Sequence, residues 1–163
     1  MAIFTGWTSV NSPTLTAETS IKFHGSQSMK MVAGASLGQV YQAVTVNINE
    51  VAGKTLRFAA RIYTTVANAA RIRVSFDEEA TFSSHAYHSG AAQWELQKLS
   101  VAVPSTATSI RAYLETTALR TAYFDAGWLA IDRLYRYTIP SGLIRGPFDV
   151  MESTLRPSAR ATW

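Results

Sequence analysis

The chain has 163 residues, of which 47% are hydrophobic and 16% are charged. This balance suits one folded domain with a sizeable core and excludes a largely disordered chain. The absence of cysteine excludes disulfides and thiolate metal sites. Fifteen Lys and Arg residues oppose 11 Asp and Glu residues, and this mild excess, without a basic block, indicates no nucleic-acid partner.

Apolar and polar residues alternate with a period of two along most of the chain. The expected strands are 40–48, 56–63, 71–76, 110–116 and 121–131. No segment before residue 140 has helical spacing, so the pattern predicts an all-β, antiparallel β-sandwich. The residues expected in its core are Leu56, Phe58, Ile62, Ile72, Val74, Phe76, Leu114 and Phe124.

Two details break the regular alternation. Trp94 and Leu96 lie in one phase, whereas Leu99 and the residues after it lie in the other, which predicts a bulge near Gln97 and Lys98. We expect Trp94 and Trp128 in the core. The run 121–131 is almost wholly apolar but has an acid at its centre, Asp125, which needs a partner if it is buried.

Arginine and tyrosine side chains recur in the phase opposite the apolar one. They are Tyr41, Arg57, Arg61, Tyr63, Arg71, Arg73, Arg111 and Tyr113. If their strands share a sheet, these side chains form a surface able to stack on sugars or to meet an acidic partner. The alternative is an ordinary solvated face with cross-strand pairs, such as an arginine with Glu115.

A polar segment, 77–93, separates two of the expected strands and is a candidate binding loop because of its length. It contains His85 and His88, which invite a metal or acid–base interpretation. Loop polarity alone explains the pair, since no helix face fixes their geometry. The sequence contains no phosphate-binding glycine loop and no nucleophile signature, so we expect no catalytic activity.

The alternating pattern stops at residue 138, so we divide the chain into a sandwich, 1–137, and a C-terminal arm, 138–163. Proline and glycine interrupt the arm and prevent a continuous strand or helix. We expect it to attach the protein to neighbouring subunits, or alternatively to cover an edge strand of its own sandwich. The expected contact residues are Ile144, Arg145, Phe148, Leu155, Arg156 and Trp163.

Three motifs occur in the order typical of one family. They are Gly-Ser-Gln-Ser-Met-Lys at 25–30, Val-Tyr-Gln-Ala-Val-Thr-Val at 40–46 and Tyr-Phe-Asp-Ala-Gly-Trp-Leu at 123–129. Together they resemble the jelly-roll carbohydrate-binding modules. The resemblance implies a jelly roll and a structural calcium ion held by Asp125 with backbone oxygens of Gly25 and Ser28. The alternative is that Asp125 accepts hydrogen bonds from turn amides without a metal ion.

Two functions follow as hypotheses. A single module that starts with its own methionine and has no signal peptide is similar to the stand-alone modules of bacteriophage particles. On this analogy we expect a virion structural protein, a head decoration or tail accessory protein. Such a protein is made in the host cytoplasm, is homo-oligomeric, and contacts capsid or tail subunits rather than a membrane. The alternative is a glycan-binding module that recognises carbohydrate, such as a cell-surface glycan, through the tyrosine and arginine face.

Overall fold

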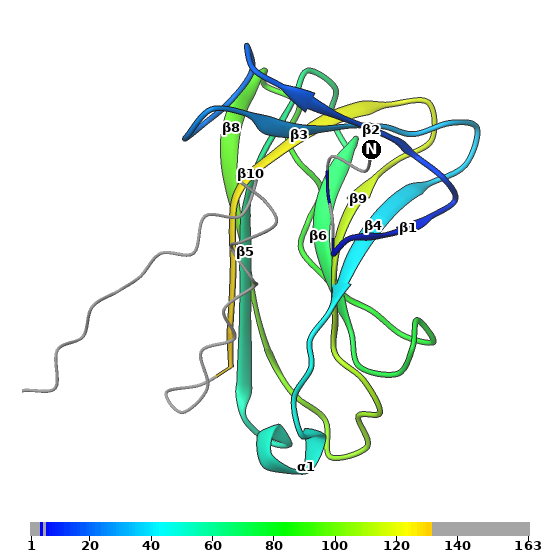
Figure 1. The fold of residues 1–163 in the computed structure, drawn as a ribbon, viewed down its shortest axis with the longest axis vertical. Coiled ribbons are helices and arrows are strands. Elements are labelled where there is room, and N and C mark those ends of the chain that lie inside the picture. Colours follow the sequence, from blue (N-terminus) through cyan, green and yellow to red (C-terminus); the bar gives the residue numbers. More distant parts are fainter. Residues whose placement is uncertain (1–3, 5, 132–163) are drawn as a thin grey trace, which may run out of the picture.

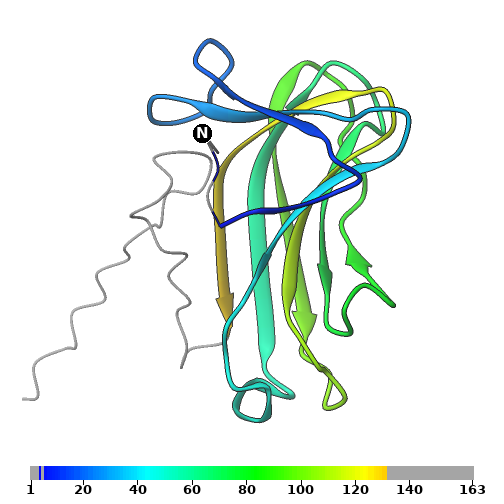
Figure 2. The same cartoon turned by 45° about the vertical axis from the view of Figure 1, so that its right-hand side comes forward.

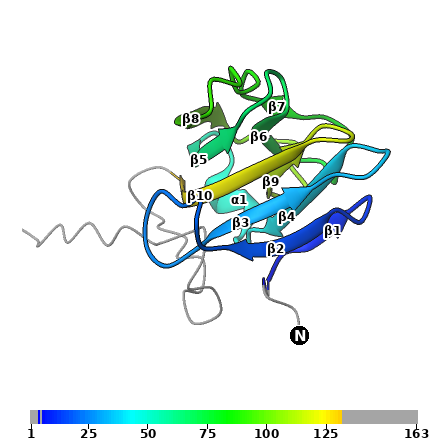
Figure 3. The same ribbon diagram turned by 90° about the horizontal axis from the view of Figure 1, so that it is seen from above.

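The computed structural model describes residue 4 and residues 6–131. Within them, ten strands form two antiparallel five-stranded sheets packed face to face (Figures 1 and 3). This architecture confirms the predicted antiparallel β-sandwich and is consistent with a jelly roll. The predicted arm, 138–163, lies outside the described residues. No helix in the described part of the chain is long and apolar enough to cross a membrane.

The first sheet, called sheet A here, has the strand order β1-β4-β9-β6-β7. Its strands are β1 (Thr8–Val10), β4 (Gly38–Ala43), β9 (Arg111–Thr116), β6 (Ala70–Ser75) and β7 (Ser83–Ser84). The second sheet, sheet B, has the order β2-β3-β10-β5-β8. Its strands are β2 (Thr14–Glu18), β3 (Ser28–Val32), β10 (Thr121–Ile131), β5 (Thr55–Thr64) and β8 (Gln93–Ala102).

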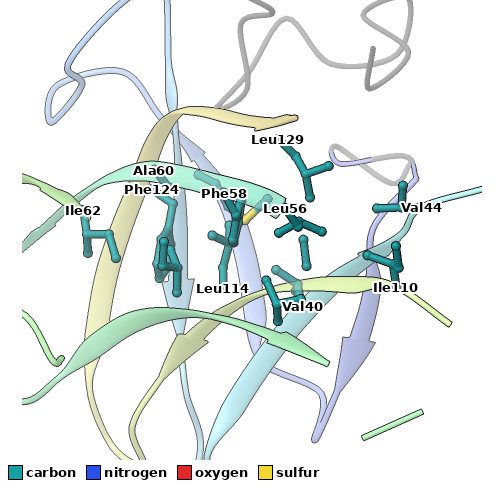
Figure 4. Close-up of a cluster of buried hydrophobic side chains, with 14 of the residues drawn as sticks. Val40, Val44, Leu56, Phe58, Ala60, Ile62, Ile110, Leu114, Phe124 and Leu129 are labelled. Carbon is teal, nitrogen blue, oxygen red and sulfur yellow. The ribbon is translucent and has the colours of Figure 1, made fainter. Parts of the chain in front are cut away.

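The apolar phase of the longer strands points between the two sheets and forms the core (Figure 4). All eight predicted core residues are buried, with relative exposures from 0% to 7%. Phe58 of β5 and Leu114 of β9 show how the layers meet, because they come from opposite sheets and enter the same cluster. The period-two pattern therefore identified the buried side of these strands.

The expected strand 40–48 is shorter than its pattern indicates. It ends at Ala43, and a single helical turn, α1 (Ile48–Val51), follows near one end of the sandwich (Figure 1). The side chain of Asn47 caps this turn by accepting a hydrogen bond from the backbone N–H of Asn49 at 3.2 Å. A capped helical turn thus occupies the end of the predicted strand.

The predicted bulge near Gln97 is wrong, because β8 pairs with β5 without interruption from Gln93 to Ala102. The phase change has another cause. Trp94 lies on the outer face of sheet B, opposite Tyr63, so the expectation that it belongs to the core is also wrong. Gln97 is instead buried between the sheets, where its side chain accepts from the Ile72 N–H at 3.0 Å and donates to the Ala86 carbonyl at 3.1 Å.

The real bulge lies in β10. Its register with β5 shifts between Asp125 and Trp128, and Ala126 has a φ of 46° in the left-handed region. β10 turns sharply along its length in Figure 1, as a bulge of this kind allows. The bulge lets Phe124 and Leu129 both point into the core, whereas Trp128 is half-buried on the outer side and does not join the core cluster.

A core substitution tests this packing. Phe58→Ala should lower the free energy of unfolding by about 3–5 kcal/mol, because it removes a filled site from the core. The control is Leu119→Ala, since Leu119 is 76% exposed and should change the free energy by under about 0.5 kcal/mol. Urea titrations measure both. A loss below about 1 kcal/mol for Phe58→Ala would mean that this layer is not packed as described.

Candidate functional site

The register of sheet A gathers five of the eight predicted arginine and tyrosine residues on its outer face. The five are Tyr41, Arg71, Arg73, Arg111 and Tyr113. Tyr113 of β9 pairs with Tyr41 of β4 on one side and with Arg73 of β6 on the other. Glu115 and Arg111 lie on either side of Tyr113 along the same face of β9, and Arg71 of β6 pairs with Glu115. We call these five residues and Glu115 the Arg/Tyr face.

Glu115 is the charged centre of this face and is 0% exposed. It accepts a hydrogen bond from Nε of Arg71 at 2.7 Å and another from Nη1 of Arg73. The side-chain amide of Gln39 donates at 3.0 Å and the hydroxyl of Tyr87 at 2.9 Å. Burial acts to raise the pKa of Glu115, but Arg73 and Arg71 outweigh it and hold the pKa below its ordinary value. The sequence alternative of a cross-strand pair between arginine and Glu115 is therefore present twice.

Aromatic rings and guanidinium groups alternate beside this centre. The ring centroids of Tyr41 and Tyr113 are 5.1 Å apart, and the guanidinium of Arg111 lies 4.9 Å from the Tyr41 ring. Phe82 meets Tyr113 edge to face at 5.2 Å, and the guanidinium of Arg73 lies 3.5 Å from the Phe82 ring. Such contacts hold flat groups in fixed orientations, because both the rings and the guanidinium planes are rigid.

The candidate loop, 77–93, lies over part of the Arg/Tyr face. The carboxylate of Glu79 accepts from Nη1 of Arg111 at 3.1 Å and from the Tyr113 hydroxyl at 2.8 Å. Tyr87 is stacked against Arg71, whose guanidinium lies 4.1 Å from its ring. Tyr113 is consequently 0% exposed. Sequence reasoning missed these loop contributions, because no periodicity relates a loop residue to a strand face.

Backbone geometry fixes the start of this loop. Glu78 and Glu79 both have positive φ values, 55° and 85°, which non-glycine residues rarely adopt. Hydrogen bonds hold the chain there. The Ser75 hydroxyl accepts from the Glu79 N–H at 2.9 Å, and Asp77 accepts from the N–H and hydroxyl of Thr81 at 2.9 and 2.6 Å. This arrangement directs Glu79 back toward Arg111.

The two histidines of the loop do not form a metal site. His88 is 0% exposed, with Nε2 3.1 Å from the carbonyls of both Ile62 and Gln93. Its Nδ1 accepts from the Gly90 N–H at 2.8 Å. Gly90 is required there, because a Cβ would lie 2.1 Å from the Ala67 nitrogen. His88 thus anchors the end of the loop, and the described residues contain no cluster of three or more potential metal ligands.

The other three predicted residues lie elsewhere. Arg57, Arg61 and Tyr63 are on β5, which belongs to sheet B, and they occupy its outer face. The eight residues therefore do not form one surface. The strand pattern determines which side of a strand is buried, but it does not determine which sheet the strand joins.

Asp125 is buried beside the turn that precedes β3, with 4% exposure. Its Oδ2 accepts from the backbone N–H groups of Phe23 at 2.7 Å and His24 at 3.0 Å, and its Oδ1 accepts from Ala126 at 2.7 Å. Burial raises the pKa of Asp125, and these amides offset part of the rise. The predicted alternative of bonds to turn amides matches this geometry, and the donors are the two residues just before Gly25.

Calcium prefers six to eight oxygen ligands, and the described residues around Asp125 include no cluster of three or more His, Asp or Glu side chains that could supply them. Asp125 is one carboxylate, and N–H groups already point at both of its oxygens. The residues present therefore do not fit a calcium site. Calcium binding remains an untested prediction of the resemblance.

Comparisons with known proteins place the fold in a class. No protein-family model matches the chain, and no curated protein matches it. Solved structures do match, and carbohydrate-binding modules are prominent among them. The sandwich of this protein is thus the fold of carbohydrate-binding modules.

Particular neighbours show the extent of this likeness. The CBM22-1 xylan-binding domain of Paenibacillus barcinonensis Xyn10C has a TM-score of 0.60 at 12% identity, over 77% of this chain and 85% of that one. The C-terminal family 22 module of Clostridium thermocellum Xyn10B has a TM-score of 0.61 at 18% identity, over 78% and 87%. The enzymatically active domain of Bacteriophage CBA120 tailspike protein 4 has a TM-score of 0.59 at 13% identity, over 78% and 19%. At these identities the likeness concerns the fold alone.

Removing the charge of Glu115 tests the Arg/Tyr face. Glu115→Gln should cost about 3–5 kcal/mol of stability near pH 7, because two partly buried arginines lose their partner. The folded-state pKa of Glu115 is lowered, so its stabilisation is present above the ordinary value of 4.5 and is lost as the pH falls through the folded value. The stability gap between wild type and variant should therefore narrow below about pH 4.5. The control is Glu78→Gln, at an exposed position. A stability difference between wild type and Glu115→Gln that does not change with pH would contradict an ionised Glu115 at the centre of the face.

Asp125 has its own test. Asp125→Ala should lower the free energy of unfolding by about 1–3 kcal/mol, because buried turn amides lose their acceptor. Thermal melts of the wild type with calcium and with a chelator should coincide if amides alone satisfy Asp125. A melting temperature that rises with calcium in the wild type, but not in Asp125→Ala, would instead establish the calcium site.

Proposed function

We propose that this protein is a non-catalytic glycan-binding module and that the outer face of sheet A contacts the sugar. The observation that carries the proposal is the Arg/Tyr face itself, in which rings and guanidinium groups are held on a rigid sheet around one buried carboxylate. The fold supports it, because three neighbours are named as xylan-binding domains. The names of these neighbours describe what those proteins bind; the class of sugar that this chain binds is part of the proposal.

The chemistry of the face suits a polar ligand with apolar ring faces. Tyrosine rings pack against the C–H faces of a pyranose, and arginines donate hydrogen bonds to its hydroxyls. Arg71 and Arg73 are fixed by Glu115 and keep only 22% and 13% of their side-chain surface exposed. They are therefore ordered on folding, so the face that Tyr41 and Arg111 continue is fixed before a sugar binds.

The position of the loop sets which part of the face is open. Glu79 and Phe82 cover Tyr113, whereas Tyr41 remains half-exposed and pairs with the exposed Thr8 of β1. A glycan chain therefore runs along β1 and β4, with Arg111 at one end of its path. The loop closes the other side and limits the width of the ligand.

The two carboxylates at this face, Glu115 and the loop residue Glu79, support binding rather than hydrolysis. Glycoside hydrolases use a pair of carboxyl groups, one of which has a raised pKa and donates a proton. Glu115 is buried, and although burial acts to raise its pKa, Arg73 and Arg71 lower it. Glu79 already accepts bonds from Arg111 and Tyr113. Neither carboxylate is arranged as a general acid.

Affinity gel electrophoresis with neutral polysaccharides tests this function. Migration should be retarded by at least one of xylan, β-glucan and mannan. Tyr41→Ala should weaken that binding about tenfold, roughly 1.4 kcal/mol, since it removes the open ring. Arg111→Ala should weaken it similarly, whereas Arg120→Ala, an arginine exposed on a different loop, is the matched control and should bind normally. Retardation by none of the three, or wild-type affinity in Tyr41→Ala, would contradict the proposal.

A second candidate is a structural component of a bacteriophage particle that attaches to neighbouring subunits through residues 138–163. The observation that favours it is the tailspike domain among the structural neighbours. Truncation after Tyr137 should then leave the melting temperature unchanged and abolish incorporation into the particle. Normal incorporation of the truncated protein would refute attachment through this segment. Glycan binding and particle attachment are compatible, since they use different parts of the chain.

A further inference from the structure

The outer face of sheet B carries a row of aromatic side chains that the proposed glycan site does not use. The register aligns Lys30 of β3 with Tyr123 of β10, Tyr123 with Tyr63 of β5, and Tyr63 with Trp94 of β8. The adjacent residues of β5 and β10, such as Ile62, point into the core, so these rings point outward. One row thus crosses four neighbouring strands.

The rings of this row touch one another. The Tyr123 and Tyr63 centroids are 5.7 Å apart, those of Tyr63 and Trp94 are also 5.7 Å apart, and Phe23 extends the chain of contacts at 6.1 Å from Trp94. Phe23 is 47% exposed, and the other three are partly exposed. We call these four residues the aromatic row.

Two elements hold the aromatic row in place. Tyr63 and Tyr123 are on strands hydrogen-bonded on both sides. Phe23 is on the turn between β2 and β3, and its backbone N–H donates to the buried carboxylate of Asp125 at 2.7 Å. The hydrogen bond to Asp125 therefore positions the exposed ring of Phe23, in addition to closing the turn.

The surroundings of the aromatic row are basic. The guanidinium of Arg61 lies 4.3 Å from the Phe23 ring, and the ammonium of Lys30 lies 5.9 Å from the Tyr123 ring. Arg57 and Lys98 have the same outward phase on β5 and β8 and are exposed. Among the described residues, two acids lie on this side: Asp125, which is buried and bonded to backbone amides, and Glu18, which lies near Lys30 and offsets part of its charge. The face therefore offers positive charge beside apolar rings.

We propose that the aromatic row and its cations form a second binding site, specific for acidic polysaccharides whose sugars carry carboxylates. The rings supply contact to the C–H faces of the sugars. Arg61 and Lys30 supply charge-assisted hydrogen bonds to uronate groups, and Arg57 and Lys98 extend the positive charge along β5 and β8. The site is on the sheet opposite the Arg/Tyr face, so the two bind independently.

The ring geometry favours a sugar chain over single-stranded nucleic acid. Nucleic-acid surfaces of this type stack successive flat bases on aromatic faces. Here neighbouring rings are inclined by 73°, 52° and 64°. They do not offer parallel faces to a run of bases, but a puckered pyranose can lie across such edges.

Titration with polygalacturonate, a polymer of uronate sugars, tests this site. Isothermal titration calorimetry at low salt should show binding that Phe23→Ala and Arg61→Gln each weaken at least fivefold. The affinity should fall as salt is added, because exposed charges contribute. Phe23 is an exposed side chain, so an unchanged melting temperature of Phe23→Ala shows that the loss is local. Tyr41→Ala, on the opposite sheet, is the matched control and should bind polygalacturonate normally.

The outcomes separate this site from the Arg/Tyr face. Loss of polygalacturonate binding in Phe23→Ala, with no neutral glycan bound by the wild type, would uphold the second site and refute the first. Three results would overturn the second site: no polygalacturonate binding, an equal loss in Tyr41→Ala, or tighter binding of oligothymidylate than of polygalacturonate. The last result would assign the face to nucleic acid.

Discussion

The buried ion cluster at Glu115 is the interaction on which the proposed glycan surface depends. A carboxylate with no solvent exposure is costly unless donors surround it, and Arg71, Arg73, Gln39 and Tyr87 supply them. These donors come from β4, β6 and the loop between β7 and β8. One charge therefore joins two strands and a loop to β9 and orients the arginines and rings around it.

Buried polar side chains hold both the loop over sheet A and the turn over sheet B in place. In each case they form hydrogen bonds with backbone groups. His88 and Gln97 bind backbone carbonyls around the loop, and Asp125 binds the amides of the turn. Figure 2 shows the loop after β6 beside sheet A, apart from the turn between β2 and β3. Both segments carry aromatic side chains: the loop carries Phe82 and Tyr87, and the turn carries Phe23. The sandwich thus positions a set of rings on both of its outer faces.

The sequence predicted the layers of the molecule better than its surfaces. Alternation in residues such as Leu56, Phe58 and Leu114 identified buried faces, because side chains in a strand point to opposite sides in turn. The same alternation could not assign strands to sheets, so Arg57, Arg61 and Tyr63 were grouped with residues of the other sheet. Sheet membership depends on long-range pairing, which a single strand does not encode.

Local signals also had two interpretations that only the three-dimensional structure separates. The shift at Trp94 indicated a bulge, but its cause is an outward-facing ring and an inward-facing Gln97. The need of Asp125 for a partner was predictable from its apolar surroundings. Its donors were not, because Phe23 and His24 lie about 100 positions earlier. Glu79, Phe82 and Tyr87 reach sheet A through loop geometry that no periodicity reports.

The central claim is that the face organised by Glu115 binds sugar. The most direct measurement is a ¹H–¹⁵N nuclear magnetic resonance titration with neutral oligosaccharides released from xylan, β-glucan and mannan. The account predicts that at least one of them shifts the amide signals of β1, β4 and β9 around Tyr41 and Arg111, while the signals of the aromatic row on sheet B stay in place. Shifts confined to sheet B, or no shift with any of the three, would contradict it.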